Sequence, residues 1–306
     1  MLARSAGRAL AAFLAAVSLA GCATTAASHV TPFAAAGTQY TQAVEALLAK
    51  STDLLVDANS RKLLQGLSLA PGTEELLDEQ DAAMRENLTE VRLLRRQLDL
   101  LGEYFASLSA LATSDVPQAF GDELGRTAAA LDGVSTALRQ TGLFRDAAAG
   151  QALVGDVGGL IVEGVRGRAL ERELERRKAT IAEVLSIQER LLDALRNQVL
   201  ADVEIDRQRD YDTEVVAPFE TEDALSGDPQ RQAWIDARRK LLTDPVLVEE
   251  LDAAAAAARA LRVAWAKVLV HRLTPGDVEA VVTKLEPIVA NVAALEAARA
   301  ADPGGD

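Results

Sequence analysis

Groups that commonly catalyse reactions or bind metals are scarce in this 306-residue sequence. The chain has one cysteine, Cys22, and two histidines, His29 and His271. A single cysteine excludes an internal disulfide and a cysteine-based metal site. The sequence also lacks the serine-hydrolase elbow, the His-Glu-x-x-His zinc motif, the phosphate-binding loop and the dinucleotide fingerprint. We therefore expect a protein that is not an enzyme, with no catalytic residues, no cofactor and no metal site.

The two histidines are expected in different parts of the structure. His29 falls in a small, polar stretch near the start of the chain, and His271 falls near the end of a predicted helix, followed by Arg272. A basic group at a helix carboxyl end interacts favourably with the negative end of the helix dipole. We therefore expect His271 to face this helix end or the surface.

Basic residues are too few to suggest a nucleic-acid partner. The chain has 46 acidic and 32 basic side chains, a formal net charge of −14 at pH 7. Neutralisation of phosphates by Lys and Arg is the main source of nucleic-acid affinity. No nucleic acid is therefore expected as a partner.

Several charged or aromatic clusters are best explained by helix surfaces and helix packing. Acidic and basic residues alternate between 171 and 183, which is typical of a solvated, ion-paired helix face. Asp115, Asp228 and Asp244 stand where helix-capping residues are expected. The tryptophans, Trp234 and Trp265, are expected to pack between the C-terminal helices. We also expect the basic run of Arg92, Arg95 and Arg96 at the surface. The periodicity places the neighbouring aromatics Tyr104 and Phe105 on the buried face.

The first twenty-two residues have the parts of a bacterial export signal. Arg4 and Arg8 precede an apolar run from Ala9 to Ala20, and the sequence Leu19-Ala20-Gly21-Cys22 follows the pattern of a lipobox. The run would span only about 18 Å as a helix, short of the roughly 30 Å of a bilayer core, so cleavage is a better interpretation than a permanent span. This segment resembles the signal peptide of bacterial lipoproteins.

The resemblance implies cleavage between Gly21 and Cys22 and attachment of lipid, including a palmitate-type acyl chain, to Cys22. A residue other than Asp after the cysteine, here Ala23, implies transfer to the outer membrane, facing the periplasm; the inner membrane and the cell surface are alternatives. The competing interpretation is an ordinary secretory signal cut after Ala23 or Ala26. Without Arg4 and Arg8 the mature chain would carry 30 basic and 46 acidic side chains, a net charge of −16.

The pattern of the rest of the chain predicts an all-α, elongated antiparallel helical bundle with long, coiled-coil-like helices. Its apolar residues recur at helical spacing, and Pro or Gly stands at the ends of the periodic segments. We expect helices near 32–69, 73–113, 115–140, 167–215, 229–242, 246–272 and 275–300, the last bent at Pro287. In domain terms, we expect a signal peptide over 1–21, a flexible tether over 22–31, the helical bundle over 32–301 and a disordered tail over 302–306.

The helix expected over 73–113 carries the clearest pattern. Apolar residues repeat every seven positions with leucines interleaved, which is the seam of a coiled coil and demands a long partner helix. The helix expected over 167–215 is the natural partner by length. The seam consists of Met84, Val91, Leu94, Leu98, Leu101, Phe105, Leu108 and Ala112.

The segment from Leu143 to Val165 is rich in both glycine and apolar residues. Gly155 and Gly159 are four positions apart, a spacing that lets two helices approach closely. The segment also resembles, in outline, the apolar tongue that helical pore-forming toxins insert into membranes. Against insertion, four charged residues would be costly in hydrocarbon: Arg145, Asp146, Asp156 and Glu163. Close packing in a helix turn is therefore the favoured interpretation.

These features favour a membrane-anchored, periplasm-facing lipoprotein that acts as a structural or protein-interaction module of the bacterial envelope. Its expected partners are the membrane, through the lipid, and an envelope protein or a second copy. One alternative is a membrane-active protein that uses residues 143–165. A second alternative is a carrier with a ligand pocket between helices.

Overall fold

The computed structural model describes residues 25–66, 73–114, 118–141, 165–220, 227–243 and 248–301, and every regular element in these ranges is helical. The expected all-α, antiparallel bundle is confirmed. The described residues form seven α-helices, one short π-helix (η2) and one short 3-10 helix (η3): α2 (Thr25–Gly66), α3 (Thr73–Thr113), α4 (Gln118–Arg139), α6 (Val165–Asp210), η2 (Tyr211–Val216), η3 (Ala217–Phe219), α7 (Asp228–Thr243), α8 (Val248–Leu269) and α9 (Pro275–Ala301).

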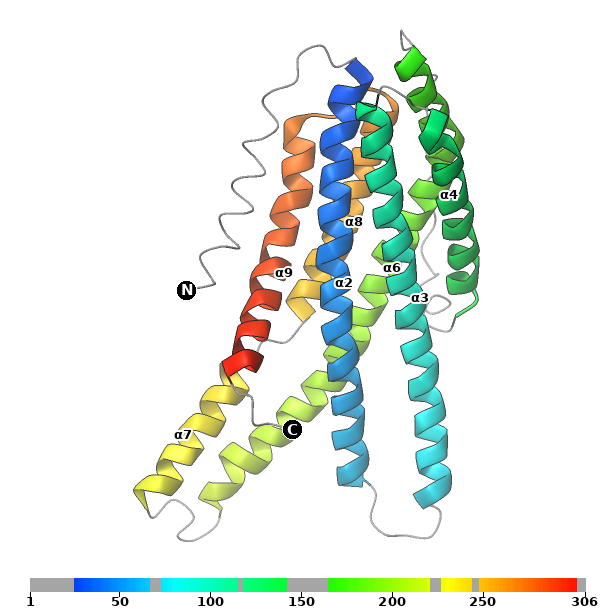
Figure 1. Ribbon diagram of the computed structural model, residues 1–306. Helices are drawn as coiled ribbons and strands as arrows, with labels where there is room; N and C mark the ends of the chain where they lie inside the picture. The colour runs from blue at the N-terminus through cyan, green and yellow to red at the C-terminus, as the bar shows by residue number, and fades with distance from the viewer. Residues whose placement is uncertain are drawn as a thin grey trace.

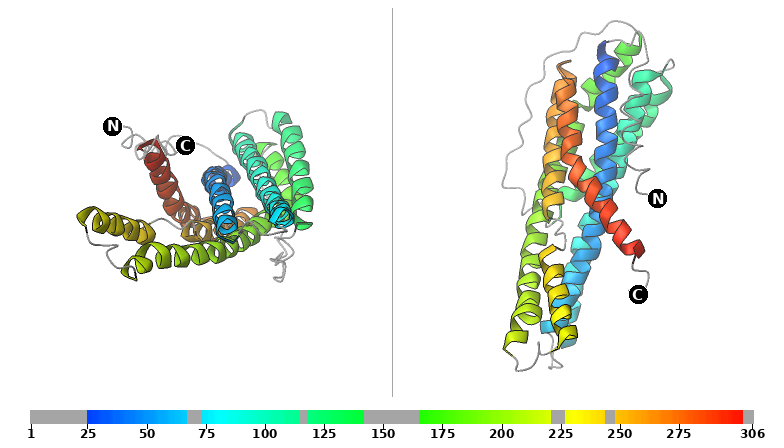
Figure 2. Two further views of the ribbon diagram at one scale, coloured as in Figure 1. Left: turned by 90° about the horizontal axis from the view of Figure 1, so that it is seen from below. Right: turned by 90° about the vertical axis from the view of Figure 1, so that its left-hand side faces the viewer.

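The long helices lie roughly along one direction, with α2 in contact with four others (Figure 1). The α2–α3 and α6–α8 interfaces are the most extensive, and α3–α4 and α8–α9 complete the bundle. Figure 2 shows that α6 and α7 reach away from the other helices at one end, and that α9 changes direction along its length. Pro287 lies inside α9, as expected for the bend.

The expected flexible tether over 22–31 is wrong for residues 25–31, which form the first turns of α2. Val30 is 1% exposed and Phe33 is fully buried, so this end of the helix is packed into the core. Burial of these side chains stabilises helix ahead of Pro32, which therefore lies inside α2 and not at its start. Residues 22–24 and 302–306 lie outside the described residues.

The expected pairing of the long charged helix with the coiled-coil seam is also wrong. The seam of α3 is buried from Val91 to Ala112, whereas Met84 is only partly buried. However, α3 packs mainly on α2 and α4, while α6 packs mainly on α8. The periodicity identified the buried face of α3, but it carried no information on which helix covers that face.

An aromatic cluster joins four helices at the centre of the bundle. The Phe33 ring of α2 lies 5.4 Å from the Phe105 ring of α3, edge to face, and 5.5 Å from the Trp265 ring of α8. The Trp265 indole N–H donates to the Lys178 carbonyl of α6 at 3.1 Å. Edge-to-face aromatic pairs contribute about 0.5–1.5 kcal/mol beyond area burial. Three large aromatic rings are therefore buried together where the long helices meet.

Candidate functional site

The proposed lipid-attachment residue, Cys22, the cleavage residue Gly21 and residues 143–164 of the glycine-rich segment lie outside the described residues. The nearest described residue to Cys22 is Thr25, where α2 begins. Val165 is the first residue of α6. Among the described residues, four features are candidates for a functional site: an apolar groove, an ion-pair network, a buried carboxylate and a pair of histidines.

An apolar groove runs between α2 and α9 and has a volume of about 510 Å³. Small and apolar side chains form most of its wall, and Val289 is 48% exposed. A volume of this size falls within the roughly 300–1,000 Å³ of small-molecule sites. Sequence periodicity gave no signal for this groove, because it depends on the angle between two helices. Its lining consists of Gln39, Gln42, Ala43, Ala46, Val282, Leu285, Glu286, Val289, Ala290, Val292 and Ala293.

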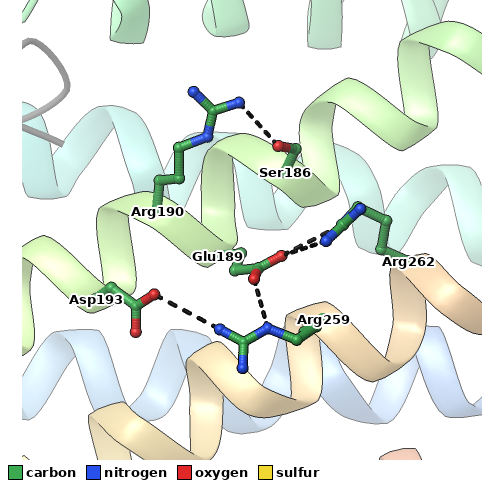
Figure 3. A network of polar contacts seen from close by, with 6 residues as sticks. All are labelled: Ser186, Glu189, Arg190, Asp193, Arg259 and Arg262. Carbon is green, nitrogen blue, oxygen red and sulfur yellow. Dashed lines mark hydrogen bonds and ion pairs between the residues drawn. The ribbon is translucent and has the colours of Figure 1, made fainter. Parts of the chain in front are cut away.

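Glu189 on α6 forms the centre of an ion-pair network with α8 (Figure 3). Its carboxylate accepts hydrogen bonds from Arg259 Nε at 2.6 Å and from Arg262 Nη2 at 3.0 Å. The Glu189 side chain is only 13% exposed. Arg259 Nη2 also lies 3.9 Å from Asp193 Oδ2. The hydrogen bond that the Arg259 guanidinium donates to Glu189 raises the pKa of Arg259. Both guanidinium groups are thus paired with a carboxylate across the interface, and the network fastens α6 to α8.

The expectation of a wholly solvated charged face on 171–183 is wrong at one position. Glu175 and Lys178 form an exposed pair at 2.6 Å, and Glu183 pairs with Arg139 of α4. Glu173, however, is 5% exposed and lies 3.4 Å from Arg177. Burial raises the pKa of Glu173, although Arg177 opposes this shift.

Tyr104 lies close enough to Glu173 for the charge of the carboxylate to affect its hydroxyl. Its side chain is fully buried, and its hydroxyl has no hydrogen-bond partner among the described residues. Burial raises the pKa of Tyr104 well above its usual value, and the charge of Glu173 raises it further. The Tyr104 phenol is therefore held in its neutral form, and its ring packs in the core.

The remaining basic, capping and aromatic residues named from the sequence lie at helix surfaces, helix ends and helix interfaces. Arg95 pairs with Glu45 of α2, which fits the expected surface role, and Tyr104 and Phe105 lie in the core. Asp228 opens α7 with its side chain 99% exposed, whereas Asp115 and Asp244 lie outside the described residues. The tryptophans do not share one interface. Trp265 packs against Phe33 of α2, and the Trp234 indole N–H donates to the Val215 carbonyl while its ring meets Phe219.

His271 ends α8, as its position in the sequence suggested. The amide of His271 donates to the Val268 carbonyl and the amide of Arg272 donates to the Lys267 carbonyl, the bond pattern of a Schellman turn. His271 adopts a φ of 52°. Its ring centroid lies 6.5 Å from that of His29 on α2, a meeting that the sequence analysis missed.

Within the described ranges, no helix is long and apolar enough to cross a membrane, and no group of three or more His, Cys, Asp and Glu residues is placed to hold a metal ion. Comparison with protein-family models, with curated proteins and with solved structures finds no match to this chain.

Proposed function

We propose that this chain is a lipoprotein of the bacterial envelope, anchored through Cys22 in the outer membrane, whose helical bundle faces the periplasm and holds a protein partner or a second copy. The lipobox-like sequence Leu19-Ala20-Gly21-Cys22 motivates the anchor. The observation that carries the positioning role is the start of α2 at Thr25, two residues beyond Ala23. A lipid on Cys22 would be joined to the packed bundle by a very short link.

The short link changes what the anchor can do. Residues 25–31 are helical, and Val30 and Phe33 are buried among the other helices. A bundle joined in this way stays close to the bilayer surface, whereas a ten-residue flexible tether would let it wander. The 42-residue α2 is about 60 Å long at 1.5 Å per residue, so its far end could stand well away from the membrane.

The far ends of α2 and α3 form an arm that we propose as the docking surface (Figure 1). Between Thr73 and Glu90 the sequence has seven acidic residues and one basic residue, Arg85. Glu75, Asp78, Glu79, Asp81 and Glu86 are all exposed. This charge favours a partner with a basic face, since complementary potentials speed encounter and suppress wrong partners.

The anchor is tested by intact mass and fractionation. The protein and its Cys22→Ala variant are produced in a bacterium with two membranes. We expect a membrane-bound species that begins at Cys22 and is heavier by acyl chains, and we expect Cys22→Ala to lose both properties. A soluble, unmodified chain, or a chain cut elsewhere, contradicts the proposal.

The docking arm is tested by site-specific photo-crosslinking in the same cells. A photoreactive residue replaces Glu79 on the arm, and a matched probe replaces the exposed Glu279 at the opposite end of the bundle. We expect a discrete adduct from position 79 and none from position 279. An adduct of twice the chain's mass identifies a second copy, and equal labelling at both positions contradicts docking through the arm.

The groove between α2 and α9 favours a second candidate function, a carrier of a flexible apolar ligand such as an acyl chain. Ala290 and Ala280 are both exposed on α9, but only Ala290 lines the groove. Ala290→Phe should therefore abolish binding of a fluorescent fatty acid, whereas Ala280→Phe should leave it unchanged. Absence of saturable binding to the unmodified protein contradicts this function.

A further inference from the structure

The two histidines of the sequence come from opposite ends of the chain and meet in the fold. His29 lies in the first turns of α2, and His271 lies in the turn between α8 and α9. Their ring centroids are 6.5 Å apart and their planes are tilted by 46°. Each side chain is half-buried. The proximity of the two histidines of the chain therefore calls for an explanation.

His271 combines an uncommon backbone conformation with a buried ring nitrogen that lacks a partner among the described residues. Its φ of 52° lies in the left-handed region, and the corresponding position of a Schellman turn is usually glycine or asparagine. Its Nε2 atom is buried and has no hydrogen-bond partner among the described residues. Buried polar atoms are nearly always paired, and an exception calls for an explanation such as a bound ion.

A transition-metal ion between the two rings would account for the unpaired Nε2 atom and for the meeting of the two imidazoles. Neutral imidazole nitrogens bind such ions at about 2.0–2.1 Å, which places each ring centroid roughly 3.2 Å from the metal. Two rings on opposite sides of one ion would then have centroids up to about 6.4 Å apart. The observed separation of 6.5 Å slightly exceeds this maximum, so the two rings must move closer together to bind one ion.

We propose that His29 and His271 together bind one divalent transition-metal ion, with solvent completing its coordination. The described residues place no third His, Cys, Asp or Glu with the pair, so the site keeps open positions. Imidazole suits copper, zinc and nickel, and affinity rises toward Cu²⁺ and falls at Zn²⁺. The site would therefore take Cu²⁺ more tightly than Zn²⁺.

Metal at this site would tie the beginning of α2 to the turn between α8 and α9. These elements are distant in sequence, and α2 already contacts both helices. An ion that binds only the folded arrangement stabilises it by mass action. The inference does not depend on lipid attachment, because neither ligand is Cys22.

The test measures Cu²⁺ and Zn²⁺ binding to tag-free, full-length protein, alone and with Cys22→Ala, since a free thiol would itself bind metal. His29→Gln and His271→Asn remove one ligand each, and asparagine tolerates the left-handed backbone. His271→Gly serves if His271→Asn does not fold. Glu279→Gln, an exposed position on α9, is the matched control.

We expect one equivalent of Cu²⁺, a nitrogen splitting pattern from two imidazoles in its electron paramagnetic resonance spectrum, and a rise in Tm with metal. Each histidine variant should weaken binding at least tenfold and leave a single-imidazole spectrum, and the control should match the parent. Absence of stoichiometric binding, or binding unchanged by both histidine variants, overturns the proposal.

Discussion

Gly37 on α2 faces the aromatic ring of Phe105 on α3 so closely that a Cβ atom added to Gly37 would lie 2.4 Å from the ring. A reciprocal approach occurs nearby, where a Cβ on Gly102 of α3 would lie 2.9 Å from Thr41 Oγ1 of α2. Each helix thus offers one position without a side chain to a residue of the other. This close approach allows the most extensive interface of the bundle to form around the Phe105 ring.

Gly37→Ala should destabilise the protein despite the higher helix propensity of alanine. The new methyl group would displace the Phe105 ring, which is fully buried and contacts Phe33. Overpacking of a core costs about 1–3 kcal/mol. Urea denaturation should therefore show a lower free energy of unfolding.

Gly133→Ala on α4 is the matched control, because a Cβ there meets nothing within 4 Å. In an open helical position the same substitution should stabilise by up to about 1 kcal/mol. Equal effects of the two substitutions would show that Phe105 does not occupy the space beside Gly37.

Removal of a single hydroxyl should have opposite effects at two buried tyrosines. The Tyr40 hydroxyl donates to Gln188 Oε1 at 2.6 Å, joining α2 to α6, whereas the Tyr104 hydroxyl has no partner among the described residues. Tyr40→Phe would leave a buried amide oxygen unpaired, which costs about 1–3 kcal/mol. Tyr104→Phe should be neutral or stabilising, because an unpaired polar atom is removed.

Thermal denaturation of both tyrosine variants checks this prediction. The two substitutions remove the same atom from fully buried rings, so each serves as the control for the other. A loss of Tm in Tyr104→Phe as large as that in Tyr40→Phe would indicate that the Tyr104 hydroxyl is paired in solution.

Glu189→Gln should weaken the α6–α8 interface more than a comparable change at an exposed pair. Glu189 accepts hydrogen bonds from both Arg259 and Arg262 (Figure 3). Loss of its charge removes the counter-ion of Arg262 and leaves Arg259 with the more distant carboxylate of Asp193. We expect a loss of about 1.5 kcal/mol in the free energy of unfolding, the low end for hydrogen bonds to charged groups, because the Arg259 side chain is 55% exposed.

Glu175→Gln is the matched control for Glu189→Gln. Glu175 lies on the same helix and pairs with Lys178, but its side chain is 50% exposed. Surface ion pairs contribute about 0–1 kcal/mol, so this variant should remain close to the parent in urea denaturation. A loss as large as that of Glu189→Gln would contradict the central role of Glu189.

Acid should weaken the start of α9 through Asp277. Hydrogen bonds from Lys267 at 2.5 Å and from the hydroxyl and amide of Thr274 lower the pKa of Asp277 to about 2. Because this pKa is below that of the unfolded chain, the stabilisation is complete above about pH 4 and is lost as the pH falls toward about 2. Tm measured against pH should decline over this window, and Asp277→Asn should reduce the decline.

Glu173 provides the control of opposite sign. Burial raises the pKa of Glu173, so its ionised form disfavours folding, and protonation removes this penalty as the pH falls. Glu173→Gln should therefore raise Tm at neutral pH and lose this advantage in mild acid. A lower Tm for Glu173→Gln at neutral pH would show that the Arg177 pair outweighs the cost of burial.

The sequence predicted the positions of the helices better than it predicted which helices pack against one another. The seven-residue repeat placed Leu98, Phe105 and Leu108 in the core because spacing along a helix determines which side chains share a face. The choice of α2 and α4 as partners of α3 depends on surfaces far apart in sequence. Gly37 went unnoticed for the same reason, since the role of an isolated glycine is defined by the ring that faces it.

The candidate sites were still less accessible to sequence reasoning. The groove depends on the crossing of α2 and α9, and the meeting of His29 with His271 requires the whole bundle to close. Glu173 belongs to a charged run typical of solvent exposure, yet its helical turn faces Tyr104. The proposed lipid site is the exception, because an export signal is recognised from adjacent residues and needs no tertiary structure.

Two arms leave the bundle, the docking arm of α2 and α3 and an arm that contains α7, and both should open locally more easily than the centre of the bundle (Figure 1). Between residues 75 and 89 of α3, and throughout α7, none of the described side chains is buried, whereas the aromatic cluster around Phe33 is closed on all sides. Local opening needs little free energy where few apolar contacts are broken. Backbone amides in the arms should therefore exchange with deuterium long before those beside Phe33 and Trp265, and the arms could change shape around a partner without disturbing the helices that support them.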